Sequence, residues 1–579
     1  MYRICLCLAA MAAAAYPSSA NAAPAKPDAF RSTVEQGLSE AQIDQLALLA
    51  QVWGFTKYHH PLAVSGKRDW DAELFTLLPR IAAAKSRNHA ASILNDWLIG
   101  LGPIQPCSPC AQIPADLHLQ SPVPEWLDGG TVPEPLAATL KTIFDRRQKL
   151  GAQHYLKLAP DIRNALFINE SGESGDPSDP KQRLLGLFRY WNAVLYWFPY
   201  RDVIARPWTG VLKDYVPLFA RADEPPEYAS VLRKLSTEIG DGHSSISMTA
   251  PQPSGAAPSS ETLCALPVGA TFLDDRLTVE RIAEPGTSPL RLGDIVLAVD
   301  GRPIPTTYER IAPNIPASNE SWRKKIGANF PLIGECGKVS LDVLRGGKWM
   351  KIEAQRTPID ARWLFQHTHD LDGETFQMLG DVAYLKLSSI KAENVPTYMD
   401  RARSARGLVI DIRNYPSDFM PFVLGPYLVD RPTLFSAITR PVIDTPGAFE
   451  WTATAPIEPV EVDQRYTKPV VVLVDELSMS QSEYTAMAFR AGGATIIGST
   501  TAGADGNVST LQLPTGWKMN FTGLGIFYPD RRPTQRLGIV PDIHVRPTPE
   551  GIAAGRDEVL ERALEHIRSA RPDGATSRD

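Results

Sequence analysis

The sequence lacks three features that would each indicate a different class of protein. Its 59 lysines and arginines are outnumbered by 65 aspartates and glutamates, so the net charge of −6 suggests no nucleic-acid partner. After the first 23 residues, no segment approaches the roughly 18 consecutive apolar residues of a membrane span, so we expect no transmembrane segment in that part of the chain. A hydrophobic fraction of 44% and a charged fraction of 21% exclude a mostly disordered chain, a coiled coil or a collagen-like fibre.

The N-terminus carries the pattern of a secretory signal peptide. Arg3 supplies a positive charge, residues 4–15 form a short apolar stretch, and Ala20-Asn21-Ala22 is an A-x-A cleavage site. The apolar stretch is too short to span a bilayer. We therefore predict a signal peptide over residues 1–22 and a secreted or periplasmic mature protein.

Cysteine is scarce, with 6 residues in 579, and four of them remain in the mature chain. Cys107 and Cys110 form a C-x-x-C with no second such pair, which disfavours zinc and favours a structural disulfide over a redox pair. Cys264 and Cys336 flank one predicted module, which a disulfide between them could close. Nothing in the sequence requires a metal or an organic cofactor.

Residues 30–249 are predicted to be a mainly helical N-terminal region with an internal repeat at about 45–85 and 183–223. Four anchors recur with spacings of 8, 9 and 9 residues, and the two copies lie 138 residues apart. The anchors are Trp53, Pro61, Trp70 and Pro79 in the first copy, and Trp191, Pro199, Trp208 and Pro217 in the second. We expect the tryptophans to pack between helices.

Short alternating strands are predicted over residues 263–357. The run 290–301, LRLGDIVLAVDG, resembles the R-x-G-D-x-I-x-x-V-[ND]-G signature of PDZ domains. This resemblance implies a domain that binds a peptide C-terminus by strand addition. It places Val268, Gly269 and Ala270 in the segment where a PDZ domain binds the peptide carboxylate.

Residues 375–570 alternate buried, β-rich runs with helices, which predicts an α/β core whose parallel strands are covered on both faces. The run 470–474 leads through DELSMSQSE into a helix. A serine in such a strand-to-helix turn lies near the positive end of the helix, which favours an oxyanion. Ser478, Ser480 and Ser482 are each also credible as ordinary N-caps.

Residues 472–483 resemble the V-L-V-[ND]-E-x-[ST]-x-S-x-S-E segment of the tail-specific, or C-terminal processing, serine peptidases. The likeness continues through 411–414, 494–498 and 538–542, and covers about residues 230–546. It implies that Ser480 is the nucleophile. Together with the helical repeat, the resemblance predicts a multidomain α+β protein: a helical N-terminal region, a PDZ-like β domain and a crotonase-like α/β peptidase core.

The general base differs from that of the Ser-Lys branch of this family, because Ala504 stands where the lysine would be. Residues 239–245, IGDGHSS, instead resemble the G-D-G-H-[ST] motif of the tricorn-core branch. This resemblance implies that His243 is the base. Imidazole, with an unperturbed pKa of about 6.5, is suited to accept a serine proton at neutral pH.

The group that orients His243 is left open by the sequence. The tricorn branch has a glutamate close ahead of its G-x-x-P-D turn, and Gln535 occupies that place here. Asp241, Ser244 and Asp505 are the alternatives.

The oxyanion hole also departs from the family pattern. Many relatives have consecutive glycines after the D-L-R strand, whereas this chain has YPSD at 415–418, and Pro416 has no N–H. The backbone N–H groups of Gln481 and of Tyr415 or Ser417 are the expected donors.

These observations predict an exported serine peptidase acting on a peptide or protein substrate, which the PDZ-like domain could recruit by its C-terminus. One alternative is a catalytically silent peptide-binding protein that retains the fold, as the Ala504 and Gln535 departures would allow. Another is a related acyl hydrolase that acts on small esters or amides.

Overall fold

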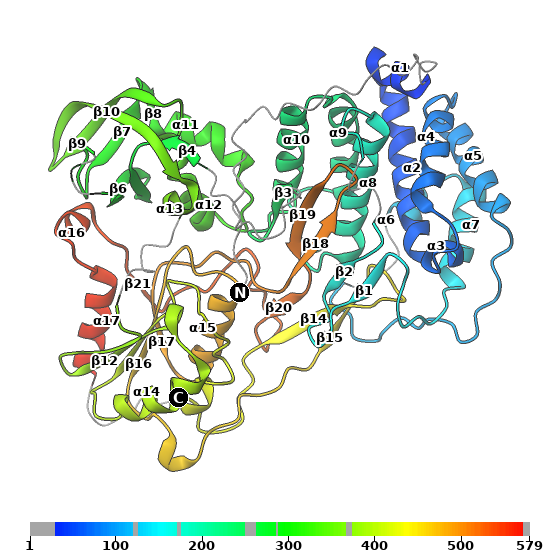
Figure 1. Ribbon diagram of the computed structural model, residues 1–579. Helices are drawn as coiled ribbons and strands as arrows, with labels where there is room; N and C mark the ends of the chain where they lie inside the picture. The colour runs from blue at the N-terminus through cyan, green and yellow to red at the C-terminus, as the bar shows by residue number, and fades with distance from the viewer. Residues whose placement is uncertain are drawn as a thin grey trace, which may run out of the picture.

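The computed structural model describes residues 29–119, 125–170, 175–248, 262–284, 286, 288–365 and 373–570. The predicted signal peptide lies outside these residues. The chain forms three parts, which are a helical region, a β domain and an α/β core (Figure 1). None of the helices in the described ranges has the length and apolar character needed to cross a membrane.

The helical region repeats one contact in its two copies. The indole N–H of Trp53 donates to the carbonyl oxygen of Trp70 at 2.7 Å, and the Trp70 indole returns the bond at 3.1 Å. Trp191 and Trp208 exchange the same pair of bonds at 2.8 and 2.9 Å. The helices are α1 (Ala29–Gln36), α2 (Glu40–His59), α3 (Pro61–Val64), α4 (Trp70–Ala82), α5 (Arg87–Gly100), α6 (Glu125–Asp128), α7 (Glu134–Asp145), α8 (Pro180–Trp197), α9 (Trp208–Arg221) and α10 (Pro225–Thr237).

A buried charge cluster lies among α2, α4 and α8. The Lys57 ammonium is 2.7 Å from Glu170 and 3.9 Å from Asp71, and Arg189 also pairs with both carboxylates. Buried ions of opposite charge compensate one another where water is excluded. The cluster therefore joins the two copies of the repeat by ion pairs as well as by apolar packing.

The β domain is a sheet of strand order β4-β10-β9-β7-β6-β5, in which β8 pairs with β7. A Cys264–Cys336 disulfide connects β4 to the segment before β9, and Cys107 and Cys110 form a second disulfide in the helical region. The elements are β4 (Thr262–Ala265), β5 (Val268–Leu273), β6 (Arg276–Ile282), β7 (Ile295–Val299), β8 (Arg302–Pro303), α11 (Ile304–Ile311), α12 (Glu320–Gly327), β9 (Gly337–Arg345), β10 (Lys348–Asp360) and α13 (Ala361–Leu364).

The α/β core is a sheet of order β11-β12-β13-β16-β17-β21, parallel from β12 onward. Apolar runs such as VVVLV in β16 form these strands because both sheet faces are buried, one against α14 and α15 and the other against α17. The elements are β11 (Phe376–Leu379), β12 (Val382–Lys386), α14 (Val395–Ala402), β13 (Leu408–Asp411), β16 (Val470–Val474), α15 (Gln481–Ala491), β17 (Thr495–Gly498), β21 (Ile543–His544), α16 (Pro549–Ala553) and α17 (Glu558–Ser569).

Small antiparallel sheets connect the helical region to the core. In one, β3 (Ser245–Met248), at the end of the predicted helical region, pairs with β19 (Trp517–Thr522) of the core, which also pairs with β18 (Val508–Gln512). This pairing places the segment before β3 beside the end of β19. The other small sheets contain β14 (Ala437–Pro441), β15 (Phe449–Thr452) and β20 (Gly525–Phe527), and β1 (Leu156–Leu158) and β2 (Ala165–Phe167).

Candidate active site

Ser480 occupies a strained turn between β16 and α15. Its φ of 58° and ψ of −120° lie in a region that non-glycine residues rarely adopt. Its backbone N–H donates to the Ala504 carbonyl oxygen at 2.9 Å and approaches the Glu483 carboxylate at 3.2 Å. Strain held in this way is common at functional sites. The turn places Ser480 at the N-terminus of α15 and in the wall of a large cavity.

Glu483 holds this turn together from inside α15. Its carboxylate accepts hydrogen bonds from Thr501, Gly503, Ala504 and the Ser480 N–H, at 2.5 to 3.2 Å. Burial raises the pKa of Glu483 to about 7, while these four donors favour its charged form.

The other two serines of the segment have different surroundings. The Ser478 hydroxyl is buried and donates to the Ile412 carbonyl oxygen at 3.2 Å. The Ser482 hydroxyl is buried on α15, without a hydrogen-bond partner among the described residues. Of the three serines, Ser480 is the one that lines the cavity.

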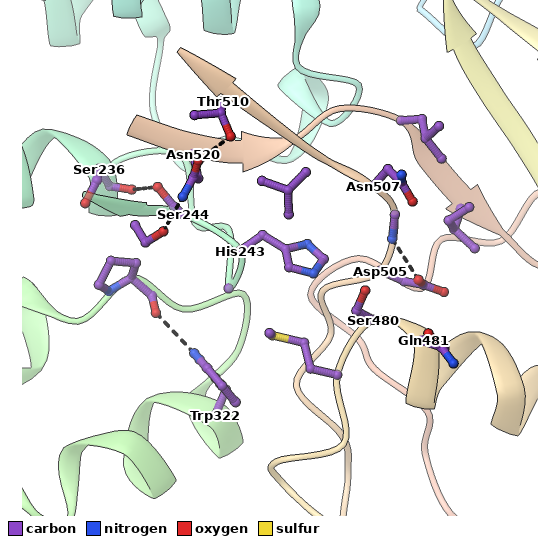
Figure 2. A pocket seen from close by; sticks show the side chains of 18 of the residues that line it. Ser236, His243, Ser244, Trp322, Ser480, Gln481, Asp505, Asn507, Thr510 and Asn520 are labelled. Atoms are coloured by element: carbon purple, nitrogen blue, oxygen red, sulfur yellow. Dashed lines mark hydrogen bonds between the residues drawn. The ribbon is translucent and has the colours of Figure 1, made fainter. Parts of the chain in front are cut away.

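His243 faces Ser480 across this cavity (Figure 2). Its Nδ1 lies 2.9 Å from the Thr522 hydroxyl oxygen, and that hydroxyl donates to Asp241 Oδ1 at 2.9 Å. Because the Thr522 hydrogen is directed to Asp241, its oxygen accepts the His243 Nδ1–H. The network therefore assigns the tautomer in which Nε2 is the proton acceptor.

Burial lowers the pKa of His243 below its usual value, and the nearby Asp241 carboxylate partly opposes this shift. The neutral ring is consequently favoured at neutral pH. Among the described residues, His243 and Ser480 face each other but form no direct hydrogen bond. The distance between a catalytic base and its serine often shortens when substrate binds.

Asp241 stands behind His243 and is fully buried. Besides the Thr522 hydroxyl, it accepts the backbone N–H groups of His243 at 3.1 Å and Thr522 at 2.7 Å. The side-chain amide of Gln535 approaches it at 3.4 Å and also contacts Ser318 at 3.2 Å. Gln535, which occupies the place where the tricorn branch has a glutamate, thus belongs to the same network.

The other two candidates for orienting His243 do not contact its ring. The Ser244 hydroxyl donates to the Ser236 carbonyl oxygen at 2.9 Å, and Asp505 accepts the Gly506 N–H at 2.7 Å. Sequence reasoning missed Thr522, because it lies 279 residues from His243 and outside any recognised motif.

Ala504, in the place of the family lysine, lies against the motif that carries His243. A β-carbon added to Gly242 would be 3.0 Å from that of Ala504. This close approach explains the need for small residues at both positions.

The expected oxyanion donors are only partly in place. Gln481 begins α15 and lines the cavity beside Ser480. The prediction for Ser417 is wrong, because its N–H donates to the Leu387 carbonyl oxygen at 2.9 Å. The segment after β13 therefore directs this N–H toward the residue that follows β12, and not toward Ser480.

The cavity has a volume of about 1150 Å³ and lies where the three parts of the chain meet. Most of its wall is apolar, which suits the side chains of an extended peptide. Its large apolar lining residues include Ile311, Ile315, Trp322, Ile326, Phe330, Phe419, Phe422, Ile438, Met479, Leu524 and Ile526.

The predicted peptide-binding residues of the β domain lie in β5, at one edge of its sheet. Val268, Gly269 and Ala270 are buried, and the Ala270 N–H donates to the Asn329 side chain at 2.9 Å. Strand addition at this edge would have to displace that contact.

Among the residues that the structure describes, no group of three or more His, Cys, Asp or Glu residues is arranged to hold a metal ion.

Comparison with known proteins finds similarity to peptidases in sequence and in fold. Residues 431–545 match the model of peptidase family S41. The chain is 24% identical over 449 residues to the putative tricorn protease homolog 2 of Streptomyces coelicolor, in a match that covers 70% of this chain. The match covers 33% of that relative, so the chain spans about a third of its length.

Among solved structures, mature CPAF has a similar fold, with a TM-score of 0.53 at 15% identity over 68% of this chain and 99% of CPAF. The complex of mature CPAF with lactacystin has a TM-score of 0.53 at 14% identity, with the same coverage. At these identities the likeness shows the fold alone. The matched segment, residues 431–545, is thus similar to peptidase family S41, and the chain as a whole resembles proteases of this kind in sequence and fold.

Proposed function

We propose that this protein is an exported serine peptidase in which Ser480 is the nucleophile and His243 the general base. One observation carries the proposal. Ser480, in its strained turn, and His243, with Nδ1 bonded to Thr522, line one cavity. An oriented base facing a serine at a helix N-terminus is the arrangement that nucleophilic catalysis requires.

The chemistry follows from this placement. The Ser480 Oγ attacks the carbonyl carbon of the scissile peptide bond, and its proton passes to His243 Nε2. The resulting imidazolium is stabilised through Thr522 by the Asp241 carboxylate. His243 then protonates the leaving amine, and water hydrolyses the acyl-enzyme with His243 again as base.

The substrate that fits the cavity is an extended peptide with apolar side chains near the scissile bond, because aliphatic and aromatic residues line most of the wall. We further propose that the β domain is PDZ-like and recruits the substrate C-terminus at β5. This recruitment requires the peptide to replace Asn329 as the partner of the Ala270 N–H.

Fluorophosphonate labelling of the protein tests the assignment. The native protein should be labelled, whereas Ser480→Ala and His243→Ala should each lose labelling. Ser482→Ala is the matched control, since its hydroxyl is buried on the same helix outside the cavity wall. Labelling that persists in Ser480→Ala would refute Ser480 as the nucleophile.

A catalytically silent peptide-binding protein is the second candidate. The engaged Ser417 N–H and the Gln535 substitution favour it. Absence of labelling in the folded native protein, together with binding of C-terminal peptides, would support this candidate. Cleavage of small esters but not of peptides would instead indicate an acyl hydrolase.

A further inference from the structure

Asp505 is a buried carboxyl group that the proposed mechanism has not used. It follows β17, has only 4% of its surface exposed and lines the cavity beside Ser480. Its Oδ1 accepts the Gly506 N–H at 2.7 Å, while its Oδ2 is buried without a hydrogen-bond partner among the described residues. A buried polar atom without a partner is costly, so this oxygen requires an explanation.

The position of Asp505 relative to the base is informative. In the view of Figure 2, Ser480 stands between His243 and Asp505, and Gln481 and Asp505 are both drawn on the side of Ser480 away from His243. A substrate carbonyl attacked by Ser480 would direct its oxygen away from the base and toward the start of α15. The Ser417 N–H, which the sequence suggested as a donor to this oxygen, instead donates to the Leu387 carbonyl oxygen.

The protonation of Asp505 follows from its neighbour Glu483. Two nearby buried carboxyl groups resist ionising together. Glu483 accepts four hydrogen bonds and Asp505 only one, so Glu483 is the group that holds the negative charge. Burial and repulsion by Glu483 accordingly raise the pKa of Asp505 well above its usual value.

We propose that Asp505 is a further catalytic residue that, as a neutral acid, turns its carboxyl group into the cavity when substrate binds and donates a hydrogen bond from Oδ2 to the developing oxyanion. This inference rests on the proposed serine-peptidase function and adds a side-chain donor to the backbone N–H of Gln481. Preorganised donors of this kind stabilise charge that exists only in the transition state and intermediate.

The bonds and protons balance without net transfer from Asp505. As the Ser480 Oγ bonds to the carbonyl carbon, the C=O electron pair moves onto oxygen and the serine proton moves to His243. Asp505 keeps its proton and only donates a hydrogen bond. When the intermediate collapses, the carbonyl reforms, the peptide C–N bond breaks and the amine leaves with the proton from His243.

Asp505→Ala and Asp505→Asn separate this role from a structural one. The alanine variant removes the donor and should lower kcat by about 100- to 1,000-fold, with KM changed by less than about threefold. The asparagine variant keeps an N–H donor of similar shape and should retain at least about a tenth of native kcat. Thermal unfolding of both variants identifies any loss through misfolding.

A peptide aldehyde adds a readout that depends on the oxyanion, because it forms a tetrahedral adduct with the serine. Its inhibition constant should rise in Asp505→Ala in parallel with the loss of kcat/KM. Binding of the matching uncleavable peptide should not change. Parallel changes indicate an interaction made in the transition state and absent from the ground state.

Several outcomes would overturn the assignment. If Asp505→Ala folds and its kcat falls by less than about tenfold, Asp505 is not a donor to the oxyanion. This result would not affect the assignment of Ser480 as nucleophile and His243 as base. If Asp505→Ala does not fold, an Asp505→Asn that folds but loses more than about nine-tenths of kcat would show that a carboxylate is required and refute the neutral-donor role. A native protein that neither cleaves peptides nor is labelled would overturn the proposed peptidase function itself.

Discussion

Replacing Thr522 with valine should slow catalysis with little effect on substrate binding. The side chain is fully buried, and valine has nearly the same shape but no hydroxyl. The change removes two bonds of 2.9 Å, from His243 Nδ1 to Thr522 and from Thr522 to Asp241. In the transition state His243 carries a positive charge, and a hydrogen bond to a charged group contributes about 1.5–3 kcal/mol.

At about 1.4 kcal/mol for each factor of ten, this loss corresponds to a fall in kcat of roughly 10- to 150-fold. The fold should survive, because Asp241 still accepts the backbone N–H groups of His243 and Thr522. The assay is kcat and KM on a fluorogenic peptide with apolar side chains, with circular dichroism to check folding.

Two controls accompany the valine variant. Thr522→Ser keeps the hydroxyl and should remain within about threefold of native kcat, because both hydrogen bonds can form. Thr510→Val alters an exposed threonine in the same cavity wall and should have no large effect. A Thr522→Val protein with kcat within twofold of native would show that Thr522 does not orient the base.

Three other predictions concern pH and stability. Because burial lowers the pKa of His243, activity should persist below pH 6.5 and disappear only as the ring protonates. The Asp241 carboxylate raises this pKa, so Asp241→Asn should move the acid limb of kcat/KM to lower pH. Lys57→Met should lower the free energy of unfolding by about 3 kcal/mol in urea titrations, because it removes one cation from a buried cluster of ion pairs. Its control, Lys213→Met, breaks an exposed ion pair and should lower the free energy of unfolding by less than about 1 kcal/mol. Gly498→Ala should abolish folding or strongly lower Tm, since φ is +139° and the added β-carbon would lie 1.8 Å from a carbonyl oxygen of β16; an unchanged Tm would contradict the packing.

The sequence predicted the features that are encoded over short distances. The apolar run of β16, the turn and the cap by Glu483 are contiguous, so the position of Ser480 at the start of α15 could be read from a dozen residues. The tandem tryptophans showed the helical repeat because each pair is separated by 17 residues and hydrogen-bonds within its own copy.

The sequence also carried the family resemblance, which selected Ser480 from three serines and His243 from the histidines. Local physics alone left those serines equivalent, since each could cap a helix. The segment that matches the model of peptidase family S41, residues 431–545, includes Ser480, whereas His243 lies outside it.

Only the tertiary structure determined what surrounds these two residues. The pairing of β3 with β19 brings Thr522 to His243 across 279 residues, and no local pattern encodes a contact of that range. The folding of the chain after β13 directs the Ser417 N–H to Leu387, and the loop after β17 places Asp505 beside Ser480. Short-range periodicity determines where strands, turns and helices form, whereas hydrogen-bond partners and charge states depend on long-range packing, which single residue patterns do not specify.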